Sequence, residues 1–542
     1  MKIKKIFLYL TGFFSGMSVM AIELGASRLM APYYSSSQIV YTIIIGTVMI
    51  AMAIGNIIGG KMADKYSDPT KLFKLIFIAS CWIALIPLVG KYIIAGVAVL
   101  LAASNLSSNF LVFAAFISCI LVFVFPLLIF GMVTPNLIKY AVGNLEENGK
   151  VVGTIEALGT IGSIIGTFLP TFVTIPYIGT SWTFIIFSIV LFIICVTYFI
   201  MRKFHIIIYS VIAVVILTIS IVFGANGSIA FFSKDTAYEG ESIYNYLRVE
   251  KDDNQTILST NVLFGVQSIK KNKDGLTGLY YDYALASNYM VDNERSNTLD
   301  GINNEKLDIL ILGLGTGTFA YQSNLYYKNC DIDGVEIDSK IVGLATKYFD
   351  LPSNVNVYVN DGRAFLDVTD KKYDVILVDA YQDITIPFQM SSIEFFKKVK
   401  DHLKDKGVMV VNLNMYTNNE GGINDYICGT IRNCFDNAYK VKCNTNCEVY
   451  ACNGFDLKES LSKSINLIDN IELKIMMTRV YLRMEFVEKN DYILTDDKAP
   501  VELLGMDVLD DMIFDELDYY RNLIKGKSIR EVIQMAQNGE LF

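Results

Sequence analysis

Histidine is scarce in this 542-residue chain, which contains only His205 and His402. Protein metal sites commonly use imidazole ligands, so the composition argues against a histidine-ligated metal centre. Nine cysteines are present, but their one loose group, Cys443, Cys447 and Cys452, does not match the spacing of a zinc site. We therefore expect no metal ion and interpret the cysteines as structural or incidental thiols.

The sequence also lacks an excess of positive charge. Its formal net charge is −9 and its isoelectric point is about 5.1. Proteins that bind nucleic acids present basic surfaces to the phosphate backbone, so the charge argues against a nucleic-acid partner. No Ala-x-Ala-type cleavage site follows the first apolar run, which comes after Lys2, Lys4 and Lys5. We expect that run to be a retained helix rather than a signal peptide.

Hydrophobic residues, by contrast, make up 53% of the chain, and the mean hydropathy is +0.40. Nearly all of the excess lies in the first two fifths of the sequence, where several runs approach the roughly 20 residues that span a bilayer. The sequence predicts a polytopic α-helical membrane domain followed by a soluble α/β domain. We place the membrane domain at 1–230, the soluble domain at 231–505 and an acidic helical tail at 506–542.

We expect seven membrane spans, near 6–26, 38–59, 73–90, 110–131, 153–175, 181–201 and 204–224. Residues 92–104 form a shorter eighth candidate. The GxxxG pairs Gly55–Gly59 and Gly162–Gly166 predict that their helices approach neighbours closely. This arrangement makes the protein a multi-pass cell-membrane protein in contact with lipid.

The side of the membrane that holds the soluble domain depends on the number of spans. Lysines at the N-terminus and in the 61–74 loop mark the cytoplasmic side. Seven spans also place Lys139, Lys150, Arg202 and Lys203 inside, but put the soluble domain outside. Counting 92–104 as an eighth span returns that domain to the cytoplasm, where nucleoside cofactors are made. The prediction is a cytoplasmic soluble domain.

The soluble domain is organised around residues 307–317, LDILILGLGTG. An apolar run is followed by three glycines at alternate positions, Gly313, Gly315 and Gly317. This pattern is typical of a buried parallel strand that is followed by a tight turn and a helix. Glycine allows the backbone to approach a nucleoside closely. Glu336 lies 23 residues after Gly313, and an acidic residue about 20 residues on commonly binds ribose hydroxyls.

Further strands are expected at 332–337, 355–359, 373–378 and 408–413. Asp361 and Gly362 follow the second of these strands, and Asp379 follows the third. Because the carboxyl ends of parallel strands share one edge of the sheet, these residues predict a ligand cleft. The fold is therefore Rossmann-like, of the class I methyltransferase type, over residues 300–505.

A small β region is expected at 235–275, ahead of this fold. Glu241–Val249 alternates like a strand, and 261–268 reads as its hairpin partner. Residues 277–283 form a tyrosine-rich helix start. Its tyrosines, near a carboxylate, have either a packing role or a role in lining a cation pocket.

In these segments the chain resembles the membrane-fused members of the spermidine synthase (polyamine aminopropyltransferase) family. In the membrane half the resembling segments are ELGASRLMAPY (23–33), GNIIGGKMAD (55–64), GMVTPNLI (131–138) and GTIEALGTIGSIIGTFLP (153–170). In the soluble half they are ESIYNY (241–246), GVQS (265–268), ILGLGTGT (311–318), GVEID (334–338), NDGRAF (360–365), YDVILVDAY (373–381) and LTDDKAPVELL (494–504).

The resemblance implies an aminopropyl transfer from decarboxylated S-adenosylmethionine to a diamine such as putrescine, giving spermidine and methylthioadenosine. Asp379 resembles the proton acceptor of that reaction. The implied contacts to the nucleoside cofactor come from Asn245, Gly313, Gly315, Thr316, Gly317, Glu336, Asp361 and Gly362. The implied contacts to the amine come from Gln267, Tyr281, Asp282, Gln382 and Asp383. A homodimer is a further expectation.

The amine half of the site departs from the family pattern. Thr316 replaces an aspartate that grips the aminopropyl ammonium in soluble members, and Gln382 replaces a second aspartate after the catalytic one. Both changes remove negative charge. Asp282 and Asp383 are the candidates to restore it.

Three functions stay open on this basis. The first is an aminopropyltransferase. The second is another transferase that uses S-adenosylmethionine itself, since Thr316 would not repel a cofactor carboxylate. The third is a non-catalytic membrane transporter or sensor of polyamines.

Overall fold

We describe the protein from a computed structural model. It describes residues 5–34, 36–103, 110–142, 148–225, 227–231, 235–261, 265–291, 306–380, 386–413, 420–443 and 446–505, with 522–523, 525–527, 531 and 535 near the C-terminus. The predicted helical tail at 506–542 therefore lies almost entirely outside the described residues.

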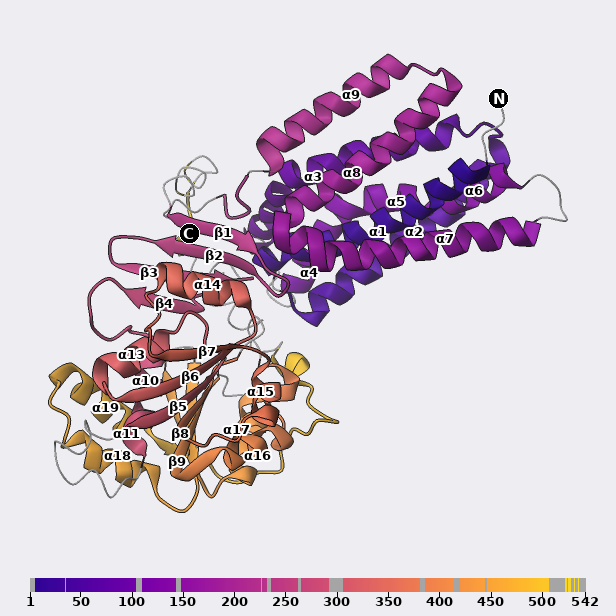
Figure 1. Ribbon diagram of the computed structural model, residues 1–542. Coiled ribbons are helices and arrows are strands. Elements are labelled where there is room, and N and C mark those ends of the chain that lie inside the picture. Colours follow the sequence, from indigo (N-terminus) through magenta and orange to yellow (C-terminus); the bar gives the residue numbers. More distant parts are fainter. Residues whose placement is uncertain are drawn as a thin grey trace.

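The N-terminal part is a helical bundle (Figure 1). Its elements are α1 (Lys5–Tyr34), α2 (Gln38–Lys65), α3 (Thr70–Ala103), α4 (Phe110–Cys119), η1 (Ile120–Val124), α5 (Phe125–Gly131), α6 (Val133–Ala141), α7 (Asn148–Leu169), η3 (Pro170–Thr174), α8 (Ile175–Arg202), α9 (Ile206–Ile219) and η4 (Ser220–Ala225). Within the described residues, six helical segments are long and apolar enough to cross a membrane. The bundle is therefore compatible with a membrane-spanning domain.

Glycines bring several of these helices into backbone contact. A Cβ added at Gly162 on α7 would lie 2.0 Å from the Phe13 carbonyl oxygen on α1, and one at Gly55 on α2 would lie 2.2 Å from that of Leu128 on α5. No side chain larger than hydrogen fits at such separations. The predicted close packing at both GxxxG pairs is confirmed.

Residues 92–103, which belong to the shorter candidate for an eighth span, continue α3 as one helix. One of the six apolar helical segments, Asn148–Arg202, is 55 residues long. However, Gly179 has a non-helical φ of 87° that breaks this stretch into two lengths. At 1.5 Å per residue the full segment would be roughly 80 Å long, far more than the ~30 Å hydrocarbon layer, so two passes fit it better than one.

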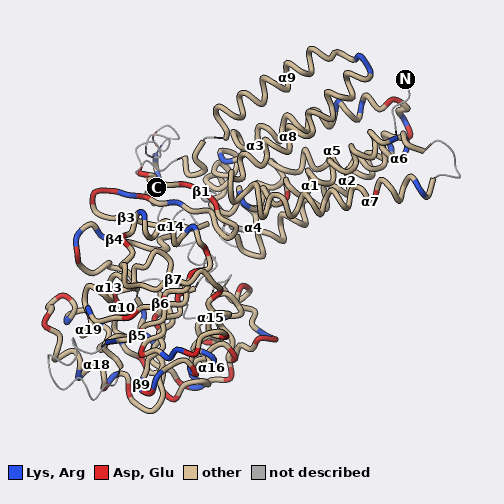
Figure 2. The backbone as a smooth tube through the Cα atoms, viewed as in Figure 1, with Lys and Arg blue, Asp and Glu red and all other residues tan. Residues whose placement is uncertain are grey.

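Contacts at the two ends of α8 orient the bundle relative to the soluble domain. At its start, Thr180 donates to the buried Glu241 carboxylate at 2.6 Å, and Lys340 donates to the Pro176 carbonyl oxygen at 2.5 Å. At its other end, Arg202 pairs with Asp68 at 2.7 Å, in the connection between α2 and α3. Figure 2 shows basic residues gathered at this second end, remote from the α/β domain.

A four-stranded antiparallel sheet joins the bundle to the α/β domain. Its strands, in order, are β1 (Thr236–Glu241), β2 (Tyr246–Lys251), β3 (Gln255–Thr260) and β4 (Ser268–Lys271). The small β region is thus present, but its predicted pairing is wrong. The expected strand 241–249 is interrupted between β1 and β2, and β2 pairs with β3 rather than with 261–268. The short loop at 252–254 is the turn that the polar run Asp252-Asp253-Asn254 favours.

The main sheet has eight strands in the order β12-β10-β11-β9-β8-β5-β6-β7. The predicted parallel strands are confirmed as β5 (Leu307–Leu312), β6 (Cys330–Glu336), β7 (Val355–Val359), β8 (Tyr373–Val378) and β9 (Leu403–Leu413). β10 (Asn437–Cys443), β11 (Asn446–Cys452) and β12 (Glu485–Phe486) extend it antiparallel. This is the Rossmann-like, methyltransferase-type fold that the sequence predicts.

Helices cover both faces of the main sheet (Figure 1). The core on one face includes α10 (Tyr280–Ala284), α11 (Ala286–Met290), α13 (Thr318–Tyr326), α18 (Leu457–Ile465) and α19 (Ile471–Arg483). The core on the other face includes α15 (Gly362–Val368), α16 (Ile393–Asp401) and α17 (Ile423–Cys434). α14 (Ser339–Tyr348) packs against the small sheet instead.

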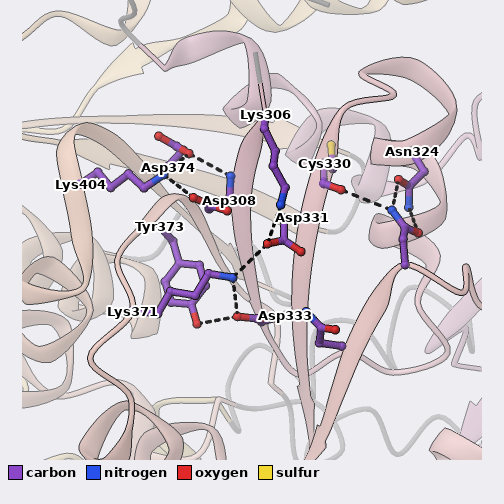
Figure 3. Close-up of polar contacts among 12 residues, drawn as sticks. Lys306, Asp308, Asn324, Cys330, Asp331, Asp333, Lys371, Tyr373, Asp374 and Lys404 are labelled. Atoms are coloured by element: carbon purple, nitrogen blue, oxygen red, sulfur yellow. Dashed lines mark hydrogen bonds and ion pairs between the residues drawn. The ribbon is translucent and has the colours of Figure 1, made fainter. Parts of the chain in front are cut away.

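Ion pairs hold the strands together near their amino ends (Figure 3). Lys404 bridges Asp308 on β5 and Asp374 on β8, the latter at 2.8 Å. Lys371 lies 2.9 Å from the buried Asp333 carboxylate on β6. These lysines compensate carboxylates that would otherwise be buried without a counter-charge. These ion pairs lie away from the carboxyl ends of the same strands, where the ligand cleft is predicted.

Candidate active site at the carboxyl ends of the strands

Gly313, Gly315 and Gly317 form the turn between β5 and α13, and all three have positive φ angles, of 91°, 55° and 86°. A Cβ at Gly313 would lie 2.4 Å from the Asp379 carbonyl oxygen, so the turn packs against the end of β8. L-residues with side chains are strained in this conformation, which explains the three glycines. The predicted strand–turn–helix is confirmed.

Glu336 lies at the end of β6 and is held by this turn. Its carboxylate accepts hydrogen bonds from the backbone N–H groups of Gly315 at 2.9 Å and Asp338 at 3.0 Å. Burial raises its pKa to about 7, although these two donors oppose the shift. The carboxylate is therefore fixed beside the glycine turn, as a ribose ligand needs to be.

A polar network continues from Glu336 to the small sheet. Asp338 caps α14 and accepts hydrogen bonds from Asn245 at 3.3 Å and from the Ser242 hydroxyl at 2.5 Å. The Asn245 side-chain oxygen in turn accepts from Asn261 at 2.8 Å. The predicted residue Asn245 is thus positioned next to Glu336 by two partners that the sequence analysis did not identify.

Asp361 and Gly362 lie beyond β7, on the next strand of the sheet. The Asp361 side chain caps α15 by accepting from the Ala364 N–H at 2.9 Å. The N–H of Asn360 donates to the Glu336 carbonyl oxygen at 3.2 Å, which brings this strand end beside Glu336. The predicted nucleoside-contacting residues therefore share one edge of the sheet.

Asp379, at the end of β8, is a buried carboxylate that receives two side-chain hydrogen bonds. One oxygen accepts from Asn412 on β9 and the other from the Tyr280 hydroxyl on α10, each at 2.8 Å. Burial raises its pKa to about 7, the two hydrogen bonds lower it, and the nearby Glu336 raises it. A carboxyl group that titrates near neutrality is suited to accept a proton.

Tyr281 and Gln267, two of the predicted amine-contacting residues, bond to each other beside Tyr280. The Tyr281 hydroxyl donates to the Gln267 backbone carbonyl at 2.7 Å, and its ring stacks on Tyr280 at 4.1 Å between centroids. It is therefore the adjacent Tyr280 that reaches Asp379. The sequence indicated that a tyrosine of this segment lies near a carboxylate, but it did not show which of the tyrosines contacts Asp379.

Thr316 is buried in the glycine turn, where its backbone N–H donates to the Ser268 hydroxyl at 3.2 Å. Its own hydroxyl oxygen has no hydrogen-bond partner among the described residues. A buried hydroxyl without a partner is unfavourable, so it is available to a polar ligand group.

Asp282, one of the candidates to restore the missing charge, is bonded to the loop before α10. Its oxygens accept from the Thr277 N–H and hydroxyl and from the Gly278 N–H, at 2.7–2.8 Å. These bonds use the carboxylate to shape the loop before α10. The other candidates, Gln382 and Asp383, lie outside the described residues.

Within the described part of the chain, no group of three or more His, Cys, Asp or Glu residues is arranged to hold a metal ion. The polar residues missed by sequence reasoning are Ser242, Tyr280, Asp338 and Asn412. Asn412 is a polar residue within the apolar end of β9, and a polar residue at that position of a buried strand could have identified it as a candidate site residue.

Comparisons with known proteins identify the family to which this chain is similar. The profile of the Spermine/spermidine synthase domain family matches residues 299–447. A probable polyamine aminopropyl transferase of Bifidobacterium longum is 46% identical over 327 residues, covering 57% of this chain and 71% of that protein. The polyamine aminopropyltransferase of Vibrio vulnificus is 33% identical over 139 residues, covering 25% of this chain and 45% of its own.

Among solved structures, a probable spermidine synthase from Corynebacterium glutamicum is 19% identical. The match covers 47% of this chain and 90% of that one, with a TM-score of 0.35.

Proposed function

Because the chain belongs to the polyamine aminopropyltransferase (spermidine synthase) family and is a transferase, we propose that it moves an aminopropyl group from decarboxylated S-adenosylmethionine to putrescine or a related diamine. The products are spermidine and methylthioadenosine. The observation that carries this proposal is Asp379, a buried carboxylate with a pKa of about 7 beside the nucleoside end of the sheet. Family membership favours an enzyme over the transporter or sensor alternative.

In the proposed reaction, Asp379 prepares the amine. An alkylammonium with a pKa near 10.4 is almost fully protonated at pH 7 and has no lone pair. Asp379 attracts the ammonium, takes one proton, and leaves a neutral nitrogen. The nitrogen lone pair forms a bond to the aminopropyl carbon next to sulfur, while the carbon–sulfur bond breaks and its electrons neutralise the sulfonium. Tyr280 and Asn412 hold the carboxylate in place.

The proposed cofactor site uses the other side of the strand edge. Glu336 is placed to accept hydrogen bonds from the ribose hydroxyls, Asp361 and Gly362 to border the adenine, and Asn245 to contact the nucleoside. The glycine turn supports this assignment because side chains at Gly313 or Gly315 would collide with Asp379 or Ser268. Glycines in such a turn let the backbone approach a cofactor closely.

The test is a product analysis with the purified full-length protein. The protein is incubated with a panel of amines and with either decarboxylated S-adenosylmethionine or S-adenosylmethionine, and the products are identified by mass. We expect spermidine and methylthioadenosine from decarboxylated S-adenosylmethionine and putrescine. Methylated amine and S-adenosylhomocysteine from S-adenosylmethionine alone would contradict the proposal.

One observation favours a second candidate, a transferase that uses intact S-adenosylmethionine. The unpartnered Thr316 hydroxyl is able to donate to the carboxylate that this cofactor retains. A charge-assisted hydrogen bond is worth about 1.5–3 kcal/mol, or about ten- to a hundredfold in affinity. Thr316→Asp should therefore weaken binding of S-adenosylmethionine and strengthen binding of the decarboxylated form. Unchanged affinity for both would remove Thr316 from the specificity argument.

We further propose that the helical bundle crosses the membrane seven times and that the α/β domain lies on the outer face. This proposal differs from the expectation of a cytoplasmic domain, which counted 92–104 as a separate span; the continuity of α3 through residue 103 supports the seven-span count. Figure 2 shows basic residues gathered at the end of the bundle remote from the α/β domain. The charges that we assign to this side lie at helix ends, with Lys2 and Lys4 preceding α1 in the sequence: Lys5, Lys61, Lys65, Lys71, Lys74, Lys139, Lys150, Arg202 and Lys203.

Before residue 230, only Arg28 and Lys91 remain for the end near the α/β domain. Both contact that region directly, Arg28 through the Ile243 carbonyl oxygen and Lys91 through that of Ser228 at 2.8 Å. Short connections rich in lysine and arginine stay in the cytoplasm. This charge bias supports a cytoplasmic N-terminus and, after seven crossings, an external catalytic domain.

The test of sidedness compares sealed membrane vesicles of opposite orientation. Decarboxylated S-adenosylmethionine and putrescine are added outside right-side-out and inverted vesicles that contain the full chain. An external active site predicts turnover by the right-side-out vesicles, and by the inverted ones only after detergent. Turnover confined to intact inverted vesicles would place the site in the cytoplasm.

A further inference from the structure

Glu448 is a buried carboxylate close to Asp379 that no step of the proposed reaction uses. It lies in the middle of β11 with an exposed fraction of 0%. Neither of its carboxylate oxygens has a hydrogen-bond partner among the described residues. A buried acid without partners is costly for the fold, whether it is charged or neutral. Such a group points to a ligand that satisfies it.

The strand register places Glu448 on the same face of the sheet as the site. Glu448 is directly opposite Asn412 in the antiparallel pair of β11 and β9. Directly opposed side chains have Cβ atoms roughly 5 Å apart and point to the same face. Asn412 in turn donates to Asp379 on β8, the next strand. The three side chains therefore form a row across neighbouring strands.

This row has one acid at each end and an amide between them. Asp379 and Glu448 are two strands apart, or about 10 Å between backbones at about 4.8 Å per strand. The two nitrogens of a four-carbon diamine are about 6 Å apart when five bonds of about 1.5 Å are extended. The separation of the two strands is thus of the same order as the length of such a molecule together with its two contacts. A dication of this length matches two acids so placed.

The charge balance of the amine site also calls for a second acid. Thr316 is neutral, and the Asp282 carboxylate is fully engaged with the loop at 277–278. Of the residues predicted to contact the amine, Asp379 is thus the one remaining carboxylate within the described part of the chain, for a substrate with two ammonium groups. Burial raises the pKa of Glu448 well above its usual range, and the charge of Asp379 adds to this. A bound ammonium would offset both effects.

We propose that Glu448 binds the ammonium of the diamine that does not react, and so selects diamines over monoamines. The proposal rests on the proposed function for the identity of the amine. In this arrangement Asp379 receives the reacting nitrogen, while Glu448 fixes the far end of the chain. Asn412 separates the two carboxylates and, through its bond to Asp379, keeps the catalytic oxygen oriented.

The experiment measures putrescine and butylamine binding to the full-length protein by calorimetry, together with kcat and KM for both. The variant is Glu448→Gln, which keeps the size of the side chain and removes its charge. Glu459→Gln is the matched control, because Glu459 is 67% exposed on α18 and pairs only with Lys463 there. Butylamine has the same carbon chain as putrescine but lacks the second ammonium.

We expect Glu448→Gln to weaken putrescine binding about ten- to a hundredfold, the range for one charge-assisted hydrogen bond. Butylamine binding and kcat should change less than threefold, so the preference for the diamine disappears. The control should behave like the unmodified protein. An unchanged putrescine-to-butylamine ratio in Glu448→Gln would refute the proposal, as would an equal loss for both amines, which indicates a structural role.

The binding measurement separates this inference from the proposed reaction. If the unmodified protein binds putrescine but yields no spermidine, the proposed function fails while the role of Glu448 is still decided by the affinity ratio. If it yields spermidine and Glu448→Gln keeps the diamine preference, the role of Glu448 fails alone. An unmodified protein that binds neither amine refutes both.

Discussion

The substitution Asp379→Asn removes the proposed base while keeping its shape. Asparagine retains an oxygen for one hydrogen bond but neither the negative charge nor the ability to accept a proton. Loss of a general base typically lowers the rate by about 10²–10⁴. Cofactor affinity should change far less, because Glu336 and Asp361 lie on other strands. Asp367→Asn is the matched control, since Asp367 is half exposed on α15.

The pH dependence follows from the pKa of Asp379, which burial raises to about 7. The active form is the carboxylate, so kcat/KM should fall about tenfold per pH unit below pH 7 and level off above it. Asp379→Asn should lose this acid limb. The pKa of Glu336 is also about 7, so either carboxylate could cause the fall in kcat/KM at low pH. Glu336→Gln is the control, because the acid limb should persist in this variant if Asp379 causes it.

The same shift predicts an effect on stability. The folded-state pKa of about 7 exceeds the usual value of 3.8, so the unfolded chain loses this proton first. Stability therefore falls as pH rises from about 4 to 7 and stays reduced above it. At 1.36 kcal/mol per pKa unit, the penalty is on the order of 4 kcal/mol. Asp379→Asn should raise the thermal unfolding temperature at pH 8 and leave it nearly unchanged at pH 4.

Rate and thermal unfolding are measured on the same preparations between pH 5 and 9. The reasoning is refuted if Asp379→Asn retains turnover within threefold of the unmodified protein. It is also refuted if the acid limb remains in this variant, because another group would then supply it.

The remaining predictions concern the residues around Asp379. Tyr280→Phe removes a hydrogen bond that lowers the pKa of Asp379, so the acid limb of kcat/KM should move to higher pH, with a rate loss of about tenfold at pH 7. Tyr281→Phe should leave the limb in place, because its hydroxyl donates to a backbone carbonyl, and a shift in both variants would contradict the geometry. Glu336→Gln should weaken cofactor binding about ten- to a hundredfold with a smaller change in kcat, measured by equilibrium binding, and a purely catalytic defect would remove its ribose role.

Much of the α/β fold follows from local sequence. β5, most of β8 and the second half of β9 are short apolar runs, and β5, β6 and β8 end at or just before Gly313, Glu336 and Asp379 on the same edge of the sheet. The backbone of Gly313 and Glu336 could therefore be placed from spacing alone. β11 was missed because every one of its residues is buried, so it shows no alternation with exposed polar residues. β10 does alternate from Tyr439 to Cys443, but that run is short and was not recognised as a strand.

The contacts between distant segments could not be predicted. Tyr280 and Asp379 are 99 residues apart, and only the packing of α10 on the sheet brings them together. Asp282, two residues from Tyr280, points away to the 277–278 loop, which its position in the sequence does not reveal. Glu448 lies on a strand that was not expected. The extent of α3 likewise depended on packing, because its apolar run gives no sign of where a helix ends.

The central claim is that this chain transfers the aminopropyl group to a diamine. The most direct measurement uses decarboxylated S-adenosylmethionine with a deuterated aminopropyl group, putrescine and the purified full-length protein. The account predicts spermidine that carries the whole label, together with unlabelled methylthioadenosine, and a loss of about 10²–10⁴ in rate for Asp379→Asn. Label that stays entirely on the cofactor, while S-adenosylmethionine supplies a methyl group to the amine, would contradict it.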